Sequence, residues 1–208
     1  MMTIAPEGRL IVGGITAVSA LATILGGWAS LPLWFVAIFA AQFFREPTRH
    51  ITANDDDILA PADGRVVFVG PAPSPFDGAM MLKISVFMNV FNVHANRVPT
   101  AGKVLRSEHI QGAFFNATLD KSSEKNERHL LEIDGPCGRV VCVQVAGLLA
   151  RRVLCYAKEG DHLRVGERYG FIRFGSRADL YLPIGISPLV ALGDRVVAGI
   201  TRLAVPAA

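Results

Sequence analysis

The sequence predicts a mainly β protein, in which an N-terminal hydrophobic helical hairpin precedes a compact β-sandwich or barrel-like domain. Two observations carry this prediction. Hydrophobic residues make up 51% of the 208 residues, more than an ordinary soluble domain of this size contains, and the excess lies at the N-terminus. After residue 45 the pattern changes to short apolar or alternating runs separated by turn residues.

The apolar run 10–44 contains no charged residue. As one continuous helix it would be about 50 Å long, against about 30 Å for the hydrocarbon core of a bilayer, so a single straight span fits poorly. Gly26, Gly27 and Pro32 interrupt the run near its middle and favour two tightly connected helices. The expected membrane anchor is residues 1–45, with helices at about 10–25 and 30–44.

Basic residues flank this run on both sides, with Arg9 before it and Arg45 and Arg49 after it. By the positive-inside rule both ends are expected on the cytoplasmic side of the inner membrane, as a re-entering hairpin requires. A single tilted or kinked span is an open alternative. A cleaved signal peptide fits badly, because cleavage after the second half would remove more than the usual 15 to 30 residues, as a rough guide.

Residues 46–208 are expected to form one domain, because no linker is long enough to divide them. Turn residues recur at intervals of about ten residues, which is typical of an all-β sandwich or barrel, and no amphipathic helix is expected there. Two segments near the ends of this domain resemble each other, each a turn with Asp and Gly followed by a β-branched strand. They are PADGRVVFV at 61–69 and GDRVVAGITRLA at 193–204.

Composition excludes some classes of function. The net charge is only +3, and no interleaving of aromatic and basic residues points to nucleic acid. Cys137, Cys142 and Cys155 show no CxxC spacing and are odd in number, so we interpret them as small apolar strand residues in a reducing compartment. Neither a disulfide nor a metal site is expected.

Gly175 and Ser176, within FIRFGSRADLYLP, form a pair that could cleave its own backbone. A serine hydroxyl can attack the preceding carbonyl to give an ester, and β-elimination then leaves dehydroalanine, which hydrolyses to a pyruvoyl group with loss of ammonia. Glycine before the serine allows the close approach that such an acyl shift needs. A turn or a bulge in a strand is the alternative interpretation.

This chemistry needs a base, and histidine has a suitable unperturbed pKa. Of five histidines, His94 lies between apolar strand residues, whereas His50 and His162 have polar surroundings that indicate the surface. Asp63, in PADGR, could orient His94 as the third member of an Asp-His-Ser arrangement. From the residues alone, a structural histidine and an Asp-Gly turn remain alternatives.

Two further polar segments are candidates for binding. In SEKNERH, Arg128 could hold a substrate carboxylate or phosphate with Asn126 beside it, and a solvent-exposed turn is the alternative. The run Asp55 to Asp57 is interpreted as a solvated charge cluster, because a divalent ion would need further ligands that the sequence does not provide.

Four stretches occur in an ordered series whose order and spacing are jointly specific. At this point the chain resembles the phosphatidylserine decarboxylase family, in its short form, over nearly its whole length. The stretches are FFREPTR at 43–49, LAPADGRVV at 59–67, FNVHANRVPTAG at 91–102, and FGSR at 174–177.

The resemblance implies a proenzyme that cleaves itself between Gly175 and Ser176. The products would be a β chain of residues 1–175 and an α chain of residues 176–208 capped by pyruvoyl, the covalent cofactor. It implies catalytic roles for Ser176, His94 and Asp63, and substrate binding by Asn126 and Arg128. The implied reaction converts phosphatidylserine to phosphatidylethanolamine through a Schiff base with that pyruvoyl group.

One position departs from the pattern, since the long form has a second histidine three residues after the first and Arg97 stands there in this sequence. His94 is therefore expected to serve both cleavage and decarboxylation. Two other functions stay open: a pyruvoyl-dependent decarboxylase of a soluble amino acid, and a non-enzymatic, membrane-tethered β-hairpin module that binds a partner. A homo-oligomer is also left open.

Overall fold

The computed structural model describes residues 2–53, 57–112, 126–147, 152–173 and 176–206. The chain divides into two compact units, Met1–Thr48 and Arg49–Ala208, and each is described by itself. The division falls slightly after the expected boundary at residue 45, because the strand that follows the second helix pairs within the first unit.

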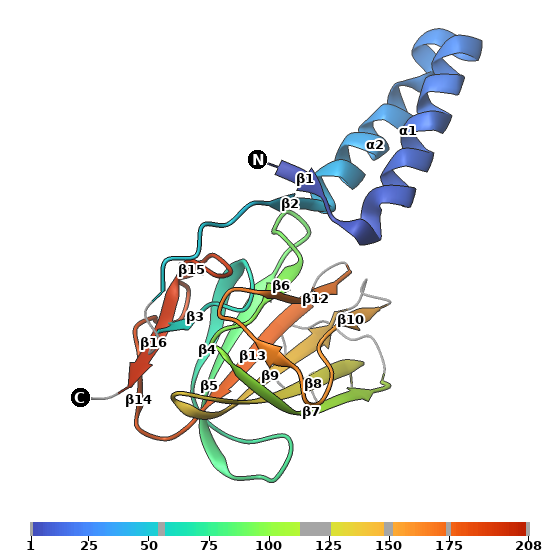
Figure 1. The fold of residues 1–208 in the computed structure, drawn as a ribbon. Coiled ribbons are helices and arrows are strands. Elements are labelled where there is room, and N and C mark those ends of the chain that lie inside the picture. Colours follow the sequence, from blue (N-terminus) through green and yellow to red (C-terminus); the bar gives the residue numbers. More distant parts are fainter. Residues whose placement is uncertain (1, 54–56, 113–125, 148–151, 174–175, 207–208) are drawn as a thin grey trace. The chain divides into compact units, whose positions relative to one another are not determined.

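The first unit is a helical hairpin closed by a pair of short strands (Figure 1). Pro6 occupies the first turn of the first helix, where its missing N–H costs nothing, and Gly27 ends that helix with φ of 54°. The elements are β1 (Met2–Ile4), α1 (Pro6–Gly26), the 3-10 turn η1 (Gly27–Ser30), α2 (Leu31–Phe43) and β2 (Arg45–Pro47).

Specific contacts hold the two helices together. Near the tip, Trp34 Nε1 donates to Thr23 Oγ1 at 2.9 Å, and Thr23 Oγ1 lies 2.8 Å from Ser30 Oγ. Near the base, a Cβ on Gly8 would overlap the Phe44 ring, so glycine permits that close approach. The polar side chains of Thr23, Ser30 and Trp34 thus satisfy one another, as an apolar environment requires.

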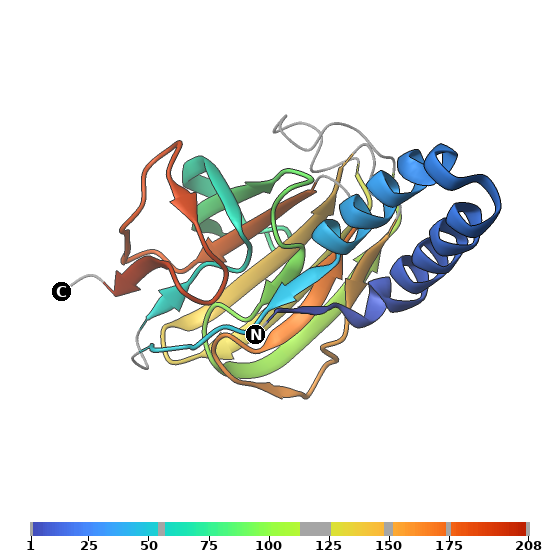
Figure 2. The ribbon, with the colours of Figure 1, turned by 90° about the horizontal axis from the view of Figure 1, so that it is seen from above.

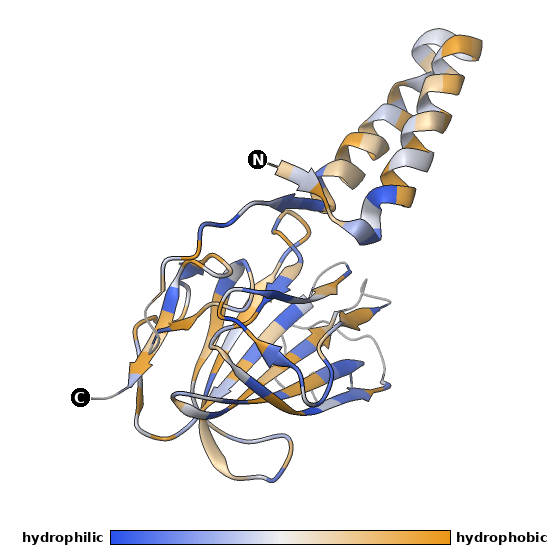
Figure 3. Ribbon diagram, in the orientation of Figure 1, coloured by the Kyte–Doolittle hydropathy of each residue, from blue (hydrophilic) through white to orange (hydrophobic). Residues whose placement is uncertain are grey.

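The outer surface of the hairpin is strongly apolar, and Figure 3 shows hydrophobic colours over most of both helices. Leu10 is 91% exposed and Trp28 is 86% exposed. The helical segment Pro6–Phe43 contains an 18-residue stretch with a mean hydropathy of 1.9, and it is long and apolar enough to cross a membrane by length and composition. Such exposed apolar surface marks an interaction with a membrane or another partner.

The second unit is built on an antiparallel sheet of eight strands within the described residues, curled into a half-barrel (Figures 1 and 2). Neighbours along the sequence pair as hairpins, and β13 is inserted between β9 and β5. In sheet order the strands are β11 (His162–Leu163), β7 (Gly102–Ile110), β8 (Arg128–Gly135), β9 (Gly138–Ala146), β13 (Ser176–Leu182), β5 (Met80–Met88), β4 (Gly64–Pro73) and β15 (Arg195–Val196).

Two smaller sheets complete this unit. The two sequence segments that resemble each other, 61–69 and 193–204, come together, because Arg195 and Val196 of β15 pair with Arg65 and Gly64 of β4. One small sheet contains β10 (Val153–Cys155), β12 (Arg168–Ile172) and β6 (Ala95–Arg97), and the other contains β14 (Ile186–Pro188), β16 (Arg202–Pro206) and β3 (Ile58–Leu59).

Strand alternation gives the large sheet two buried faces. One carries the main core, to which residues such as Ile84, Val140 and Leu180 each contribute about 1.5–3 kcal/mol by burial. The other carries a smaller cluster that includes Leu130, Val143 and Tyr181. The prediction of a mainly β protein with an apolar N-terminal helical region is confirmed, and the second unit has no helix among its described residues.

Two details of the sequence interpretation need correction. Asp57 is buried and its Oδ1 lies 2.6 Å from Arg202 Nε, so it forms an ion pair rather than part of a solvated cluster. Asp55 and Asp56 lie outside the described residues. All three cysteines are free, but Cys137 lies in the turn between β8 and β9 and not in a strand.

Candidate active site

Ser176 is the first residue of β13, which has a neighbouring strand on each side. It pairs with Met88 of β5 and with Ala146 of β9, and it is completely buried. Its Oγ points to the main core and lies 3.9 Å from Met88 Sδ. Gly175 lies outside the described residues, so the geometry of the bond between the two is not described. Ser176 therefore lies at the end of a strand that is paired on both sides, and its surroundings exclude water.

His94 lies between β5 and β6 and is also completely buried. Its Nδ1 is 3.0 Å from the Asn92 carbonyl oxygen. A carbonyl only accepts hydrogen bonds, so Nδ1 carries the proton in the neutral ring and Nε2 holds the lone pair. The His94 carbonyl accepts from the Ile172 amide at 3.2 Å, which ties the histidine to the strand that precedes Ser176.

Buried amides connect the two segments. Asn96 Nδ2 lies 3.9 Å from the same Met88 Sδ that contacts Ser176, and its Oδ1 accepts from Gln144 Nε2 at 2.8 Å. Gln144 lies on β9, two residues before Ala146. Sequence reasoning missed Asn96 and Gln144 as parts of this site. The signal that could have identified Asn96 and Gln144 is a polar side chain within a strand that is otherwise mainly apolar.

Asp63 lies in the turn that precedes β4. Its Oδ2 accepts from Arg49 at 2.8 Å and its Oδ1 accepts from the Ala198 amide at 2.8 Å. Two residues earlier, the Pro61 carbonyl accepts from the Arg97 amide at 2.9 Å. The PADG segment is thus held beside the strand that follows His94, through backbone contacts.

Asn126 is completely buried, which rules out a solvent-exposed turn at this residue. Its Nδ2 donates to the Ala146 carbonyl at 2.7 Å, and Ala146 is the cross-strand neighbour of Ser176. Asn126 therefore fixes the strand next to Ser176.

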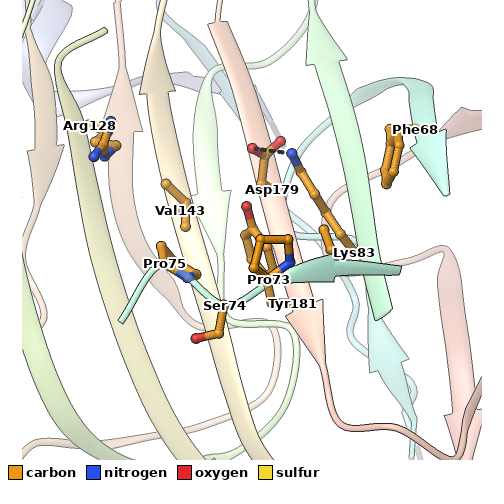
Figure 4. Close-up of a pocket in the computed structure, with 10 residues that line it drawn as sticks. Phe68, Pro73, Ser74, Pro75, Lys83, Arg128, Val143, Asp179 and Tyr181 are labelled. Carbon is orange, nitrogen blue, oxygen red and sulfur yellow. Dashed lines mark ion pairs between the residues drawn. The ribbon is translucent and has the colours of Figure 1, made fainter. Parts of the chain in front are cut away.

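Arg128 lies on the opposite face of the sheet from the Ser176 side chain. It pairs with Val145, one residue before Ala146, so the alternation of side chains turns it to the other side. There it lines a hollow of about 530 Å³ together with Lys83, Asp179 and Tyr181 (Figure 4). Lys83 Nζ lies 3.4 Å from Asp179 Oδ2. The structure does not bring the Arg128 side chain to the Ser176 face.

The part of the chain that the structure describes contains no cluster of metal-ligating side chains. Within it, no group of three or more histidine, cysteine, aspartate or glutamate side chains lies close enough together to hold an ion. The three free cysteines do not assemble either, and burial raises the pKa of the Cys155 thiol to about 11, against thiolate formation.

Comparison with known proteins gives one consistent result. The family model described as phosphatidylserine decarboxylase matches residues 36–204. A phosphatidylserine decarboxylase proenzyme of Cupriavidus pinatubonensis is 52% identical in an alignment of 206 positions that covers 97% of this chain and 94% of that protein. A protein of the same name from Neisseria meningitidis serogroup B is 50% identical over 202 residues, which are 97% of this chain and 76% of that protein.

Proposed function

Because the chain belongs to the phosphatidylserine decarboxylase family, we propose that it is a self-cleaving proenzyme that converts phosphatidylserine to phosphatidylethanolamine. One observation carries the proposal beyond family membership. Ser176 and His94 are both completely buried, and Met88 Sδ is contacted both by Ser176 Oγ and by the side chain of Asn96, which lies two residues after His94. A serine in an ordinary turn has no need of such surroundings.

The cleavage step uses Ser176 as nucleophile. Its Oγ attacks the Gly175 carbonyl carbon, the C–N bond to the Ser176 nitrogen breaks, and an ester joins the two residues. A base then removes the Ser176 α-proton, and the ester leaves as the Gly175 carboxylate. The remaining dehydroalanine takes up water and releases ammonia. His94 is suited to act as this base, because the hydrogen bond from its Nδ1 to the Asn92 carbonyl leaves the lone pair on Nε2.

The same site would carry the decarboxylation. A pyruvoyl group at Ser176 supplies an electron sink by forming a Schiff base with the substrate amine. His94 would return a proton to the substrate carbon after carbon dioxide leaves. Asn126 holds the Ala146 strand against Ser176, so it acts as a positioning residue. Binding of substrate by Arg128 stays a prediction, and its place on the other sheet face gives it no support.

Asp63 has a more indirect part in this proposal. Its two carboxylate oxygens are bound by Arg49 and by the Ala198 amide, so it stabilises the turn from which the PADG segment reaches the strand after His94. In this way it would orient His94. A charged hydrogen bond of this kind contributes about 1.5–3 kcal/mol.

The helical hairpin would hold the enzyme to the inner membrane, with the second unit on the cytoplasmic side. Its exposed apolar surface and the arginines that flank it support this location. Phosphatidylserine stays in the bilayer, so an anchor keeps the enzyme where its substrate is concentrated.

Intact mass and denaturing gel mobility of the purified protein test the proposal. We expect a fragment ending at Gly175 and a fragment 176–208 without a free amine, and Ser176→Ala should stay full length and inactive. Ser187→Ala, at an exposed position on β14, is the matched control and should mature normally. Decarboxylation by Ser176→Ala would refute the pyruvoyl assignment, and activity on free serine in place of the lipid would favour the soluble amino acid alternative.

A further inference from the structure

Self-cleavage would turn Ser176 from a residue inside a continuous chain into the first residue of the α chain. The first residues of a chain are poorly ordered unless contacts hold them. Residue 176 also loses its main-chain N–H, because its nitrogen is released as ammonia, so it keeps only its carbonyl group for strand pairing. A misplacement of about 1 Å at a reacting group can cost about 10²-fold in rate. The mature enzyme therefore needs contacts that fix the start of β13.

Main-chain pairing supplies part of this restraint. β13 lies between β9 and β5, and both of these strands belong to the β chain (Figure 1). Within the described residues, however, the pairs of Ser176 with Met88 and with Ala146 are the terminal pairs of the two ladders. A strand that begins at the end of its ladders can fray or slip unless its side chains also hold it.

The residue after Ser176 is a buried arginine. Arg177 is 1% exposed, and its side chain lies on the sheet face opposite to that of Ser176, because side chains alternate along a strand. Arg177 Nε lies 2.7 Å from Asp179 Oδ1, and Nη2 donates to Asp179 Oδ2 at 3.0 Å. Asp179 is buried to the same extent. The first residues of the α chain thus carry a buried ion pair.

A lysine of the β chain completes this cluster. Lys83 lies on β5, is buried, and has its Nζ 3.4 Å from Asp179 Oδ2 (Figure 4). The same Nζ lies 5.6 Å from the centre of the Tyr181 ring and 5.3 Å from the centre of the Phe68 ring. After cleavage Asp179 and Tyr181 belong to the α chain. Lys83 and Phe68 belong to the β chain, so the lysine contacts side chains of both chains.

Stability alone does not explain a buried cluster of this kind. Removing charges from water costs about as much as their attraction returns, and apolar side chains of similar volume are often as stabilising. Register does explain it. A shift of one residue would turn Arg177 and Asp179 into the main apolar core, and a shift of two residues would separate Asp179 from Lys83. The cluster therefore permits one alignment of β13 with β5.

We propose that Arg177, Asp179 and Lys83 form a clamp that holds the start of the α chain in register after self-cleavage, and so positions the reacting group at residue 176. The inference rests on the proposed function and deepens it. The three side chains lie on the other face of the sheet, so they are positioning residues that act through the backbone. Before cleavage the peptide bond to Gly175 also restrains Ser176, so the clamp matters most in the mature enzyme.

The first test is hydrogen exchange in the mature full-length enzyme. Lys83→Met keeps the unbranched stem between the two rings and leaves the ion pair of Arg177 and Asp179 electrically neutral. We expect the amides of residues 177–179 to exchange about 10- to 100-fold faster in this variant, because the strand end opens more often. In an uncleavable Ser176→Ala chain the same substitution should leave these amides nearly unchanged, since the chain continues through Gly175.

Kinetics on dihexanoyl phosphatidylserine below its critical micelle concentration give a second readout. Lys83→Met should lower kcat about 10- to 100-fold with KM nearly unchanged, because the clamp contacts no substrate. Cleavage on denaturing gels should proceed at nearly the wild-type rate. Lys83→Arg, which keeps the charge and can still donate to Asp179 Oδ2, should restore most of kcat.

Asp57→Asn is the matched control. Asp57 Oδ1 lies 2.6 Å from Arg202 Nε, and after cleavage this ion pair also joins the β chain to the α chain. Arg202 lies on β16, in a different sheet from Ser176. Loss of this pair should lower stability in urea, without faster exchange at residues 177–179 and without a lower kcat.

Two results would overturn the inference alone. One is a cleaved Lys83→Met enzyme with wild-type exchange at residues 177–179 and wild-type kcat. The other is equally accelerated exchange in the cleaved and the uncleavable chains, which would make Lys83 a general stabiliser of the sheet.

If Lys83→Met does not fold, a chain with Lys83→Met, Arg177→Met and Asp179→Leu together is judged by the same two criteria, because it leaves no charge of the clamp unpaired. A wild type that stays uncleaved would refute the proposed function and this inference with it, since residue 176 would then never begin a chain.

Discussion

At the level of single residues, the hydrogen bond between His94 Nδ1 and the Asn92 carbonyl is the most consequential contact. It selects the tautomer, because only one ring nitrogen can keep its lone pair while the other donates. A main-chain partner cannot be lost by mutation of a side chain, so this selection is built into the turn at residues 89–92.

We expect His94→Gln to slow maturation by about 10²–10⁴-fold, the usual contribution of a general acid or base. The time course of cleavage on denaturing gels measures it. His162→Gln, at an exposed histidine of β11, is the control and should mature at the wild-type rate. Normal cleavage in His94→Gln would remove His94 from this step.

Variants of Asp63 and of Arg49 can show whether Asp63 orients His94 or only stabilises its own turn. If Asp63 orients His94, Asp63→Asn should slow maturation by at least about tenfold more than Arg49→Gln, although each breaks the same ion pair. Cleavage rates and urea unfolding of both variants, measured together, decide this. Equal effects on rate and stability would reduce Asp63 to an anchor of its turn.

His129 predicts a pH dependence of stability. Burial, with a smaller contribution from the neighbouring charge of His109, lowers the pKa of His129 from 6.5 to about 4. The unfolded chain therefore binds a proton more readily than the folded one between pH 6.5 and 4, and the free energy of unfolding falls as the pH drops through this window.

After allowance for partial solvation, the loss is about 1–2 kcal/mol. Urea denaturation between pH 7 and 4 measures it, and His129→Gln should flatten the profile in this range. A profile that is the same in both proteins would show that His129 does not contribute.

At the level of elements, β4 depends on a glycine where it meets β5. A Cβ on Gly64 would overlap the Phe87 carbonyl oxygen, a backbone atom that cannot move without breaking the strand pair. Gly70, later in the same strand, would meet only the far edge of the Phe68 ring at 3.4 Å. The same substitution should therefore have different effects at the two positions.

We expect Gly64→Ala to destabilise the protein by about 1–3 kcal/mol, the usual cost of overpacking, and Gly70→Ala to be nearly neutral. Midpoints of urea unfolding compare the two. Equal stability of the two variants would show that the β4–β5 pair can shift to accommodate a methyl group.

At the level of the whole molecule, the division into Met1–Thr48 and Arg49–Ala208 suggests a separation of membrane attachment from chemistry. Every residue that we place in cleavage or catalysis belongs to the second unit. The first unit supplies an apolar surface, and none of its residues between Leu10 and Phe44 is ionisable.

A chain that begins at Arg49 should therefore still cleave itself and decarboxylate dispersed short-chain phosphatidylserine. On intact bilayers it should lose efficiency, because the anchor no longer confines enzyme and substrate to one surface. Cleavage on gels and carbon dioxide release on both substrates measure this. A truncated chain that folds and fails to cleave would show that the hairpin contributes to the active site itself.

The sequence by itself determined the features that are encoded in continuous segments. The apolar run, its interruption by Gly26, Gly27 and Pro32, and the strand periodicity after it were enough for the mainly β fold with a helical hairpin. The ordered motifs, from FFREPTR to FGSR, were enough for the family and for Ser176 and His94 as candidates, because each motif is a local string that can be recognised without knowing its neighbours.

Only the tertiary structure decided which residues meet. It separated Arg128 from Ser176 although Asn126 is close to Ser176, it paired Asp57 with Arg202, and it set Arg65 opposite Arg195. The physical reason is register. Side chains alternate between the two faces of a strand, so a shift of one residue in pairing exchanges the faces, and that pairing depends on segments far apart in the chain.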